Sequence, residues 1–253
     1  MIEAIDIHKS FGSTEILHSI NLRIEPGQIT ALLGPSGAGK TTLMQIVGTL
    51  MPPTRGRVLY DGKEVTGMKD RKLSEFRNRN IGFVFQFHQL LPEFSALENV
   101  MLPALIGGGS RSEASKRAKE MLDYLGLGDR LKHKPAQLSG GECQRIAVAR
   151  ALVNKPSVVF ADEPTGSLDP RNRDEIKQLF LSLCRDYGHT FVIVTHDMSL
   201  ASIAHRVVRM DGGRIIAEES NEPAANQEPC DSVIEVREDA EPATGPDDSA
   251  ETI

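Results

Sequence analysis

The stretch GPSGAGKT, residues 34–41, decides which fold to expect. It matches the pattern GxxxxGK[ST], follows a strand-like apolar run and precedes a helical pattern from Lys40 to about Leu50. Its glycines allow backbone N–H groups to turn inward around phosphate oxygens, and the N-terminus of the following helix adds positive potential. A strand, a glycine-rich loop and a helix in this order predict a phosphate-binding P-loop.

Each residue of this loop has an expected task. Lys40 should contact the β- and γ-phosphates of a nucleotide, and the Thr41 hydroxyl should bind Mg²⁺. Each charge-assisted hydrogen bond to phosphate contributes roughly 1.5–3 kcal/mol, so several together favour a bound nucleotide over an empty turn. The residues expected to bind nucleotide here are Gly34, Pro35, Ser36, Gly37, Ala38, Gly39, Lys40, Thr41 and Thr42.

Four further polar residues stand at the ends of strand-like runs. Asp162 ends the apolar run SVVFAD and is expected to hold Mg²⁺ through water. Glu163 should point elsewhere, because strand side chains alternate. It is expected to polarise the attacking water. Gln86 ends IGFVF and could reach the metal or the water; His196 ends FVIVT and could bond to the γ-phosphate. None of them is persuasive alone, since a lone histidine is more often structural. A complete P-loop upstream favours catalysis.

Composition limits the class of protein. The 253 residues are 40% hydrophobic and 25% charged, as in ordinary globular proteins. No apolar run approaches the roughly 18 residues that span a bilayer, and the N-terminus does not resemble a signal peptide. We therefore expect a cytoplasmic chain that meets a membrane only through partners. Three cysteines without CxxC spacing argue against a disulfide framework or a zinc site.

Charge divides the chain unevenly. Residues 218–253 hold 12 acidic residues and one basic residue, a net of −11, which leaves +5 for residues 1–217 when it is subtracted from the overall −6. This tail is too poor in apolar residues to fold alone, so we expect a disordered acidic extension. The mild positive charge of the remainder gives no reason to propose nucleic-acid binding.

The stretch LSGGECQR, residues 138–145, resembles half of a second phosphate-binding turn. P-loop, Gln86, LSGGE, ADEP, SLD and TH occur in the order and spacing of the ATP-binding subunits of ABC transporters, which residues 1–217 resemble. The resemblance implies an α/β fold: a RecA-like P-loop NTPase core with a mainly parallel sheet, an N-terminal antiparallel β subdomain and a helical subdomain at about 87–155. Strand patterns at 157–163 and 190–196 and a helix ending at Gly188 agree with it.

The same resemblance implies ATP hydrolysis with ATP and Mg²⁺, in a head-to-tail dimer that sandwiches two nucleotides. Phe11 would stack on adenine, at a position where the family more often has a tyrosine. Gln86 would be the coupling glutamine. Four residues would complete the nucleotide site of a second copy: Ser139, Gly140, Gly141 and Asp169. Cys143 stands where a polar or basic residue is usual. Its place near a helix N-terminus and Arg145 could lower its pKa, although a neutral substitution is the simpler interpretation.

A narrower resemblance lies in FQFHQLLPEFSALENVMLPALIGG, residues 85–108, together with ADEPTGSLD and THDMSLA. These segments resemble the ATPases of bacterial lipoprotein-releasing complexes. The resemblance implies LolC/LolE-like permease partners and a place for this chain at the cytoplasmic face of the inner membrane. Macrolide-type exporter ATPases and FtsE-like signalling ATPases stay open as alternatives. The apolar residues of this segment should form a groove for a partner helix, pack the helical subdomain, or do both; they are Leu90, Leu91, Phe94 and Leu97.

Overall fold

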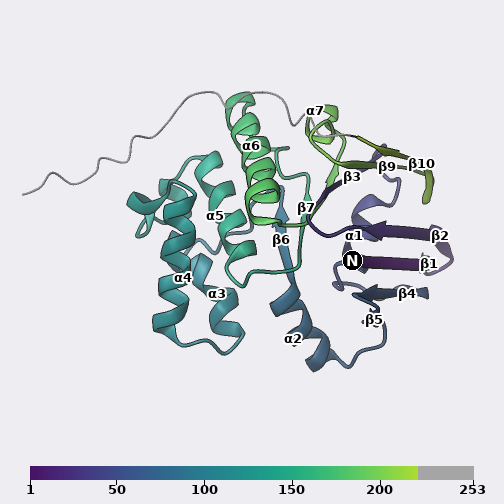
Figure 1. The fold of residues 1–253 in the computed structure, drawn as a ribbon, viewed down its shortest axis with the longest axis horizontal. Coiled ribbons are helices and arrows are strands. Elements are labelled where there is room, and N and C mark those ends of the chain that lie inside the picture. Colours follow the sequence, from purple (N-terminus) through teal and green to yellow (C-terminus); the bar gives the residue numbers. More distant parts are fainter. Residues whose placement is uncertain (222–253) are drawn as a thin grey trace, which may run out of the picture. The chain divides into compact units, whose positions relative to one another are not determined.

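The computed structural model describes residues 1–221, in which a six-stranded sheet positions the P-loop (Figure 1). Its strand order is β10-β9-β3-β8-β7-β6, with all strands parallel except β10, which pairs antiparallel with β9. The strands are β3 (Ile29–Leu33), β6 (Ile81–Phe85), β7 (Val158–Asp162), β8 (Phe191–Thr195), β9 (Arg206–Asp211) and β10 (Arg214–Ser220). The central strands are largely apolar and almost wholly buried because both faces of the sheet are covered.

A second, antiparallel sheet has the order β2-β1-β4-β5, as expected for an N-terminal β subdomain. Its strands are β1 (Ile2–Phe11), β2 (Thr14–Ile24), β4 (Arg55–Tyr60) and β5 (Lys63–Glu64). A hairpin turn joins β4 to β5 at Asp61 and Gly62, which have φ angles of 47° and 75°. Positive φ at both central residues is the geometry of a type I′ turn.

Helices cover the two faces of the six-stranded sheet. Val192 and Val194 of β8 pack in the cluster that includes α1 (Lys40–Val47) and the antiparallel sheet. Phe191 and Ile193 point the other way, into the cluster that includes α6 (Pro170–Tyr187) and α7 (Met198–Ala201). This alternation places the P-loop helix and α6 on opposite faces.

The helical subdomain has a hydrophobic core of its own, in which Val100, Ala118 and Ile146 are fully buried. Its elements are α3 (Ala96–Ile106), α4 (Arg111–Tyr124), two short 3₁₀ turns (Gly128–Arg130 and Pro135–Gln137) and α5 (Gly140–Leu152). Each of the three helices begins with a serine and a glutamate three residues later that cap one another reciprocally. These caps satisfy backbone N–H groups that would otherwise lack partners at the start of each helix.

Two features differ from the sequence expectations. Helix α2 (Asp70–Asn80) was not expected, because none of its residues is buried and its N-cap, Lys69, forms no side-chain cap. The domain boundary expected at 217 falls inside β10, which pairs with β9 as far as Ser220. The acidic tail expected at 218–253 lies mostly outside the described residues. Within residues 1–221, no helix combines the length and apolar character needed to cross a bilayer.

Candidate nucleotide-binding site

A cavity of about 810 Å³ lies at the carboxyl ends of β3, β6, β7 and β8. The expected site residues that line it come from β1, the P-loop and the three strand ends. They are Phe11, Ser36, Gly37, Ala38, Gly39, Lys40, Thr41, Thr42, Gln86, Asp162, Glu163 and His196. The carboxyl edge of a parallel sheet is where open α/β folds bind their ligands.

The P-loop is shaped by a glycine and closed by its lysine. Gly39 caps α1 with a φ of 91°, and a Cβ at that position would lie 2.7 Å from Leu17 Cδ2, so only glycine fits. Lys40 Nζ donates hydrogen bonds to the carbonyl oxygens of Gly34 (2.7 Å) and Pro35 (2.9 Å). Gly34 and Pro35 therefore hold the ammonium inside the loop, on the path that phosphate oxygens would take.

The expected metal ligands converge. Thr41 Oγ1 donates to Asp162 Oδ1 at 3.2 Å, and Gln86 lines the same cavity. Burial raises the pKa of Asp162, and the hydrogen bond from Thr41 offsets only part of that rise. Hydroxyl, amide and carboxylate oxygens are the ligands that Mg²⁺ prefers, and a half-buried carboxylate gains from a nearby cation. These residues fit Mg²⁺ bound together with nucleotide phosphates.

Glu163 makes contacts that Asp162 does not, but the reason expected for its orientation was wrong. The strand ends at Asp162, and Glu163 takes a left-handed φ of 46°, so strand alternation does not orient it. Its Oε1 lies 2.7 Å from His196 Nδ1, and its Oε2 accepts a hydrogen bond from Thr195 Oγ1 at 3.2 Å. Thr195 was missed by sequence reasoning, although a hydroxyl residue directly before His196 was a visible signal.

Phe11 stands at the open end of the cavity, half exposed, at the tip of the β1–β2 hairpin. Ile16 also lines the cavity, and Lys9 Nζ lies 5.2 Å from the centre of the Phe11 ring. An exposed aromatic ring next to a phosphate cradle suits an adenine base. Neither Ile16 nor Lys9 was expected from the sequence.

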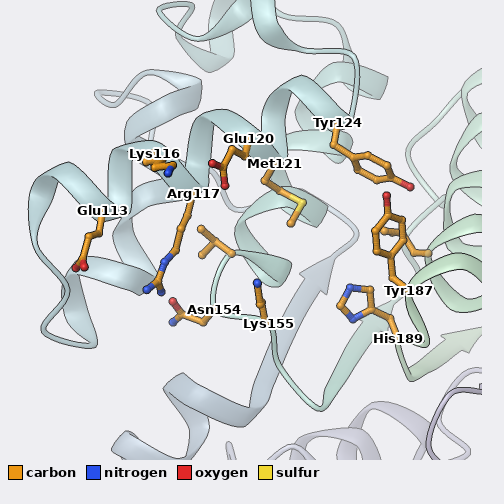
Figure 2. Close-up of a pocket in the computed structure, with 12 residues that line it drawn as sticks. Glu113, Lys116, Arg117, Glu120, Met121, Tyr124, Asn154, Lys155, Tyr187 and His189 are labelled. Carbon is orange, nitrogen blue, oxygen red and sulfur yellow. The ribbon is translucent and has the colours of Figure 1, made fainter. Parts of the chain in front are cut away.

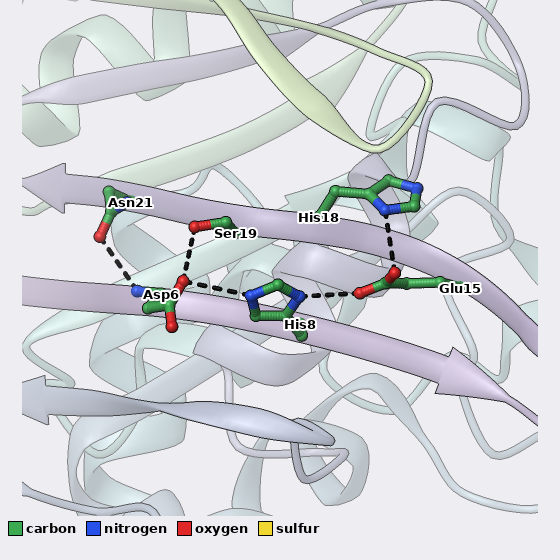
Figure 3. Close-up of polar contacts among 6 residues, drawn as sticks. All are labelled: Asp6, His8, Glu15, His18, Ser19 and Asn21. Carbon is green, nitrogen blue, oxygen red and sulfur yellow. Dashed lines mark hydrogen bonds and ion pairs between the residues drawn. The ribbon is translucent and has the colours of Figure 1, made fainter.

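A chain of polar contacts fastens the hairpin that carries Phe11 (Figure 3). His8 contacts Glu15 (2.7 Å) on β2 and Asp6 (3.2 Å) on its own strand, and Glu15 also contacts His18 (3.2 Å). A hydrogen bond from Ser19 lowers the pKa of Asp6, and the one with His8 lowers the pKa of Glu15. Both carboxylates are therefore ionised at neutral pH and hold the two strands in register.

The LSGG residues do not line this cavity. Ser139 caps α5 and accepts a hydrogen bond from Glu142 N, while Asp169 caps α6 by accepting one from Asn172 N. Gly141 lies so close to α6 that a Cβ there would sit 1.9 Å from Asn172 Oδ1. The N-termini of α5 and α6 thus form a separate group, as a composite site between two copies requires.

Two other expectations are refined. The idea that Cys143 has a lowered pKa is wrong: burial raises its pKa, and the charge of Glu142 adds to the effect. The four apolar residues of segment 85–108 divide, because Leu90 and Leu97 pack on the helical core whereas Leu91 and Phe94 are exposed.

A second pocket, of about 650 Å³, is shown in Figure 2 and shares no lining residue with the nucleotide cavity. It is lined by α4, the end of α6 and His189, which precedes β8, so it faces the amino ends of the strands. Tyr124 and Tyr187 meet edge to face there, with ring centres 5.2 Å apart. No expected site residue lines it.

A P-loop, an acidic strand end and a histidine at the next strand define a P-loop NTPase, and the separate LSGG helix narrows the class to ATP-binding cassettes. The family described as ABC transporter matches residues 17–166, and the chain belongs to that family. It is an ABC-type ATPase.

The chain is similar to curated relatives over nearly their whole length. A protein of Bacteroides fragilis named lipoprotein-releasing system ATP-binding protein LolD is 58% identical over 85% of this chain and 100% of the relative. A LolD of Bacteroides thetaiotaomicron is 59% identical over 85% of this chain and 99% of its own length.

Solved structures agree with the fold. The dimeric bacterial ABC transporter cassette MJ0796 is 39% identical, with a TM-score of 0.80 over 87% of this chain and 98% of its own. A dimeric post-hydrolysis state of MJ0796, bound to ADP and Pi, is 38% identical with a TM-score of 0.79 over the same shares.

Proposed function

We propose that the chain is the ATPase subunit of a bacterial complex that releases outer-membrane-directed lipoproteins from the inner membrane toward a periplasmic carrier. The observation that carries this proposal is the likeness, over 85% of the chain, to lipoprotein-releasing ATP-binding proteins. The working form is a head-to-tail dimer, for which the dimeric cassettes of similar fold are a precedent. The dimer sits at the cytoplasmic face of the inner membrane on LolC/LolE-like permeases.

The P-loop supplies most of the binding. The backbone N–H groups of residues 36–41 and the Lys40 ammonium hold the phosphates of ATP, and the half-exposed ring of Phe11 stacks on the base. Thr41, Asp162 and Gln86 hold Mg²⁺, which when bound neutralises charge on the phosphate oxygens. Asp162 is fixed for that task by its contact with Thr41.

Glu163 acts on the attacking water. Its carboxylate is held on both oxygens, by His196 and by Thr195, so it is oriented before the water arrives. It accepts the proton that the water loses as the oxygen attacks the γ-phosphorus. The imidazole of His196 is largely exposed toward the cavity, where it can donate to a γ-phosphate oxygen.

The second copy completes the site. The N-terminus of α5 presents the Ser139 hydroxyl and free backbone N–H groups, a ready anion site, to the γ-phosphate on the neighbouring P-loop. Hydrolysis removes the bond between that phosphate and ADP, so the contact that joins the two copies is lost. Closing and opening of the dimer then drive the permease.

An apolar surface fits the permease contact. Phe87 and Ile106 are 76% and 77% exposed, and a groove of about 420 Å³ lies beside Ile106, lined in part by Phe85 and Pro103. Exposed aromatic and aliphatic side chains around a groove suit an amphipathic helix of a partner protein.

Affinity purification from bacterial membranes tests the proposal. We expect the chain to bring down permease subunits with large periplasmic domains and lipoprotein-release activity, and the Phe87→Glu and Ile106→Glu variants to lose them. Ile216→Glu is the matched control, since Ile216 is 64% exposed but lies on β10. Recovery of a division-site protein or a macrolide exporter instead would overturn the lipoprotein assignment.

A further inference from the structure

The loop that follows Gln86 has an unusual backbone. His88 and Gln89 adopt φ angles of 58° and 49°, in the left-handed region that residues other than glycine rarely enter. Two such residues in succession persist only where the surroundings hold them. Gln86, two residues before His88, lines the nucleotide cavity, so the loop begins at that cavity.

A side chain of α5 holds the centre of the loop. Arg150 Nη2 donates to the His88 carbonyl at 2.8 Å, and Nη1 donates to the Gln89 carbonyl at 2.6 Å. One planar guanidinium thus bonds two successive carbonyls, a pairing that a lysine ammonium does not reproduce. Arg150 does not line the nucleotide cavity, so this contact is not explained by binding ATP.

Other elements hold the two ends of the loop. Ser167 Oγ donates to the Gln86 carbonyl at 2.8 Å. Asn99 of α3 accepts a hydrogen bond from Leu91 N (2.8 Å) and donates to the Leu91 carbonyl (3.1 Å). Only Arg150, among these three side chains, lies on the helix whose N-terminus carries LSGG.

We infer that Arg150 is a positioning residue that couples the LSGG end of α5 to Gln86, and so links the two nucleotide sites of a dimer. Eleven residues separate Ser139 from Arg150, about 16 Å along one helix. When the N-terminus of α5 closes on a neighbouring nucleotide, the helix moves as a rod and shifts the loop through Arg150. The inference rests on the head-to-tail dimer proposed above.

The test uses a chain that closes on ATP without turning it over, Glu163→Gln. Adding Arg150→Lys should raise the Mg·ATP concentration for half-maximal dimerisation, measured by sedimentation, by about tenfold, within the usual range of coupling between sites. The affinity of the monomer for an ATP analogue is measured in a chain that also carries Ser139→Arg, which prevents closure. Adding Arg150→Lys to that chain should change this affinity by less than about twofold. A role in folding alone would not separate these two readouts.

Arg77→Lys is the matched control. Arg77 also bonds backbone from a helix, with Nη2 donating to the Thr49 carbonyl at 2.6 Å, but it does not touch the loop after Gln86. Arg150→Gln is the second variant, in case the lysine variant folds poorly. In the Glu163→Gln dimer, hydrogen exchange of residues 87–91 should slow on ATP addition, and either Arg150 substitution should remove that slowing.

Two results would overturn the inference while leaving the proposed function intact. One is an unchanged dimerisation midpoint in both Arg150 variants, and the other is an equal shift in the Arg77→Lys control. A Glu163→Gln chain that stays monomeric at saturating ATP is a different outcome. It would remove the head-to-tail dimer first and the inference with it.

Discussion

Replacing Glu142 by alanine should loosen the end of α5 that carries LSGG. Glu142 Oε2 accepts a hydrogen bond from Ser139 N at 2.8 Å, and Ser139 Oγ accepts one from Glu142 N at 3.2 Å. Glu142 Oε1 also accepts from Arg130 Nε at 2.8 Å. Removing the carboxylate breaks the capping box and the ion pair together, and so loosens Ser139, which we propose meets the γ-phosphate of the neighbouring copy.

The magnitude follows from these contacts. A capping interaction contributes about 1 kcal/mol, and an ion pair whose arginine is 43% exposed contributes at most about 1 kcal/mol. For a domain of this size, a loss of about 1–2 kcal/mol lowers the melting temperature by about 3–6 °C. The ATPase rate should fall by about tenfold or more, because a small misplacement of a positioning group can slow a reaction up to about 10²-fold.

Glu98→Ala provides the control, since Glu98 caps Ser95 of α3 in the same way, with Oε2 accepting from Ser95 N at 2.9 Å. Both variants are compared by thermal unfolding and by ATPase rate at saturating ATP. Glu98→Ala removes a cap but no ion pair, so it should lose about 1 kcal/mol of stability, and only Glu142→Ala should lose ATPase activity. Equal loss of activity in both variants would refute the reasoning.

The pH dependence has a definite sign. The backbone hydrogen bond from Ser139 lowers the pKa of Glu142 below its usual value of 4.5. A lowered carboxylate pKa stabilises the fold fully above pH 4.5, and this stabilisation is lost as the pH falls through the lowered pKa. The stability deficit of Glu142→Ala should therefore be complete at pH 7 and shrink below pH 4.5.

Three further predictions concern the site and the chain's end. Glu163→Gln should slow turnover by about 10²–10⁴-fold in a phosphate-release assay, yet still close around ATP. Lys40→Ala should weaken ATP binding, measured by calorimetry, by about 10–100-fold, since charge-assisted bonds to phosphate are lost. A chain cut after Asn221 should melt like the full chain and keep its ATPase activity, whereas a cut after Ala217 should melt lower, because it removes the partners of Arg206 and Arg209.

Local signals in the sequence predicted the elements that position the site. The P-loop pattern and the buried apolar strands each depend on a few neighbouring residues, so the sequence of this chain was sufficient to predict them. Helix α2 lacked such signals: its apolar residues Leu73 and Phe76 are only partly buried, and no side chain caps its first turn. Propensity alone rarely reveals a helix of this kind.

The details of the site depended on contacts between distant segments. The left-handed turn at Glu163 and its bond to Thr195 require β7 and β8 to lie side by side. Arg150 meets His88 and Gln89 across 62 and 61 residues of chain, respectively. Burial of Cys143, which raises its pKa, likewise follows from packing, so a nearby helix N-terminus and Arg145 were misleading signals.

The central claim is that LSGG completes the nucleotide site of a neighbouring copy, and mixing two inactive variants tests it most directly. Ser139→Arg spoils the LSGG half and Lys40→Ala spoils the P-loop half, so each alone should be nearly inactive. In a mixed dimer one composite site has both defects and the other has none. Random pairing should therefore restore about a quarter of the wild-type ATPase rate. No recovery on mixing, or full activity of Ser139→Arg by itself, would contradict the claim.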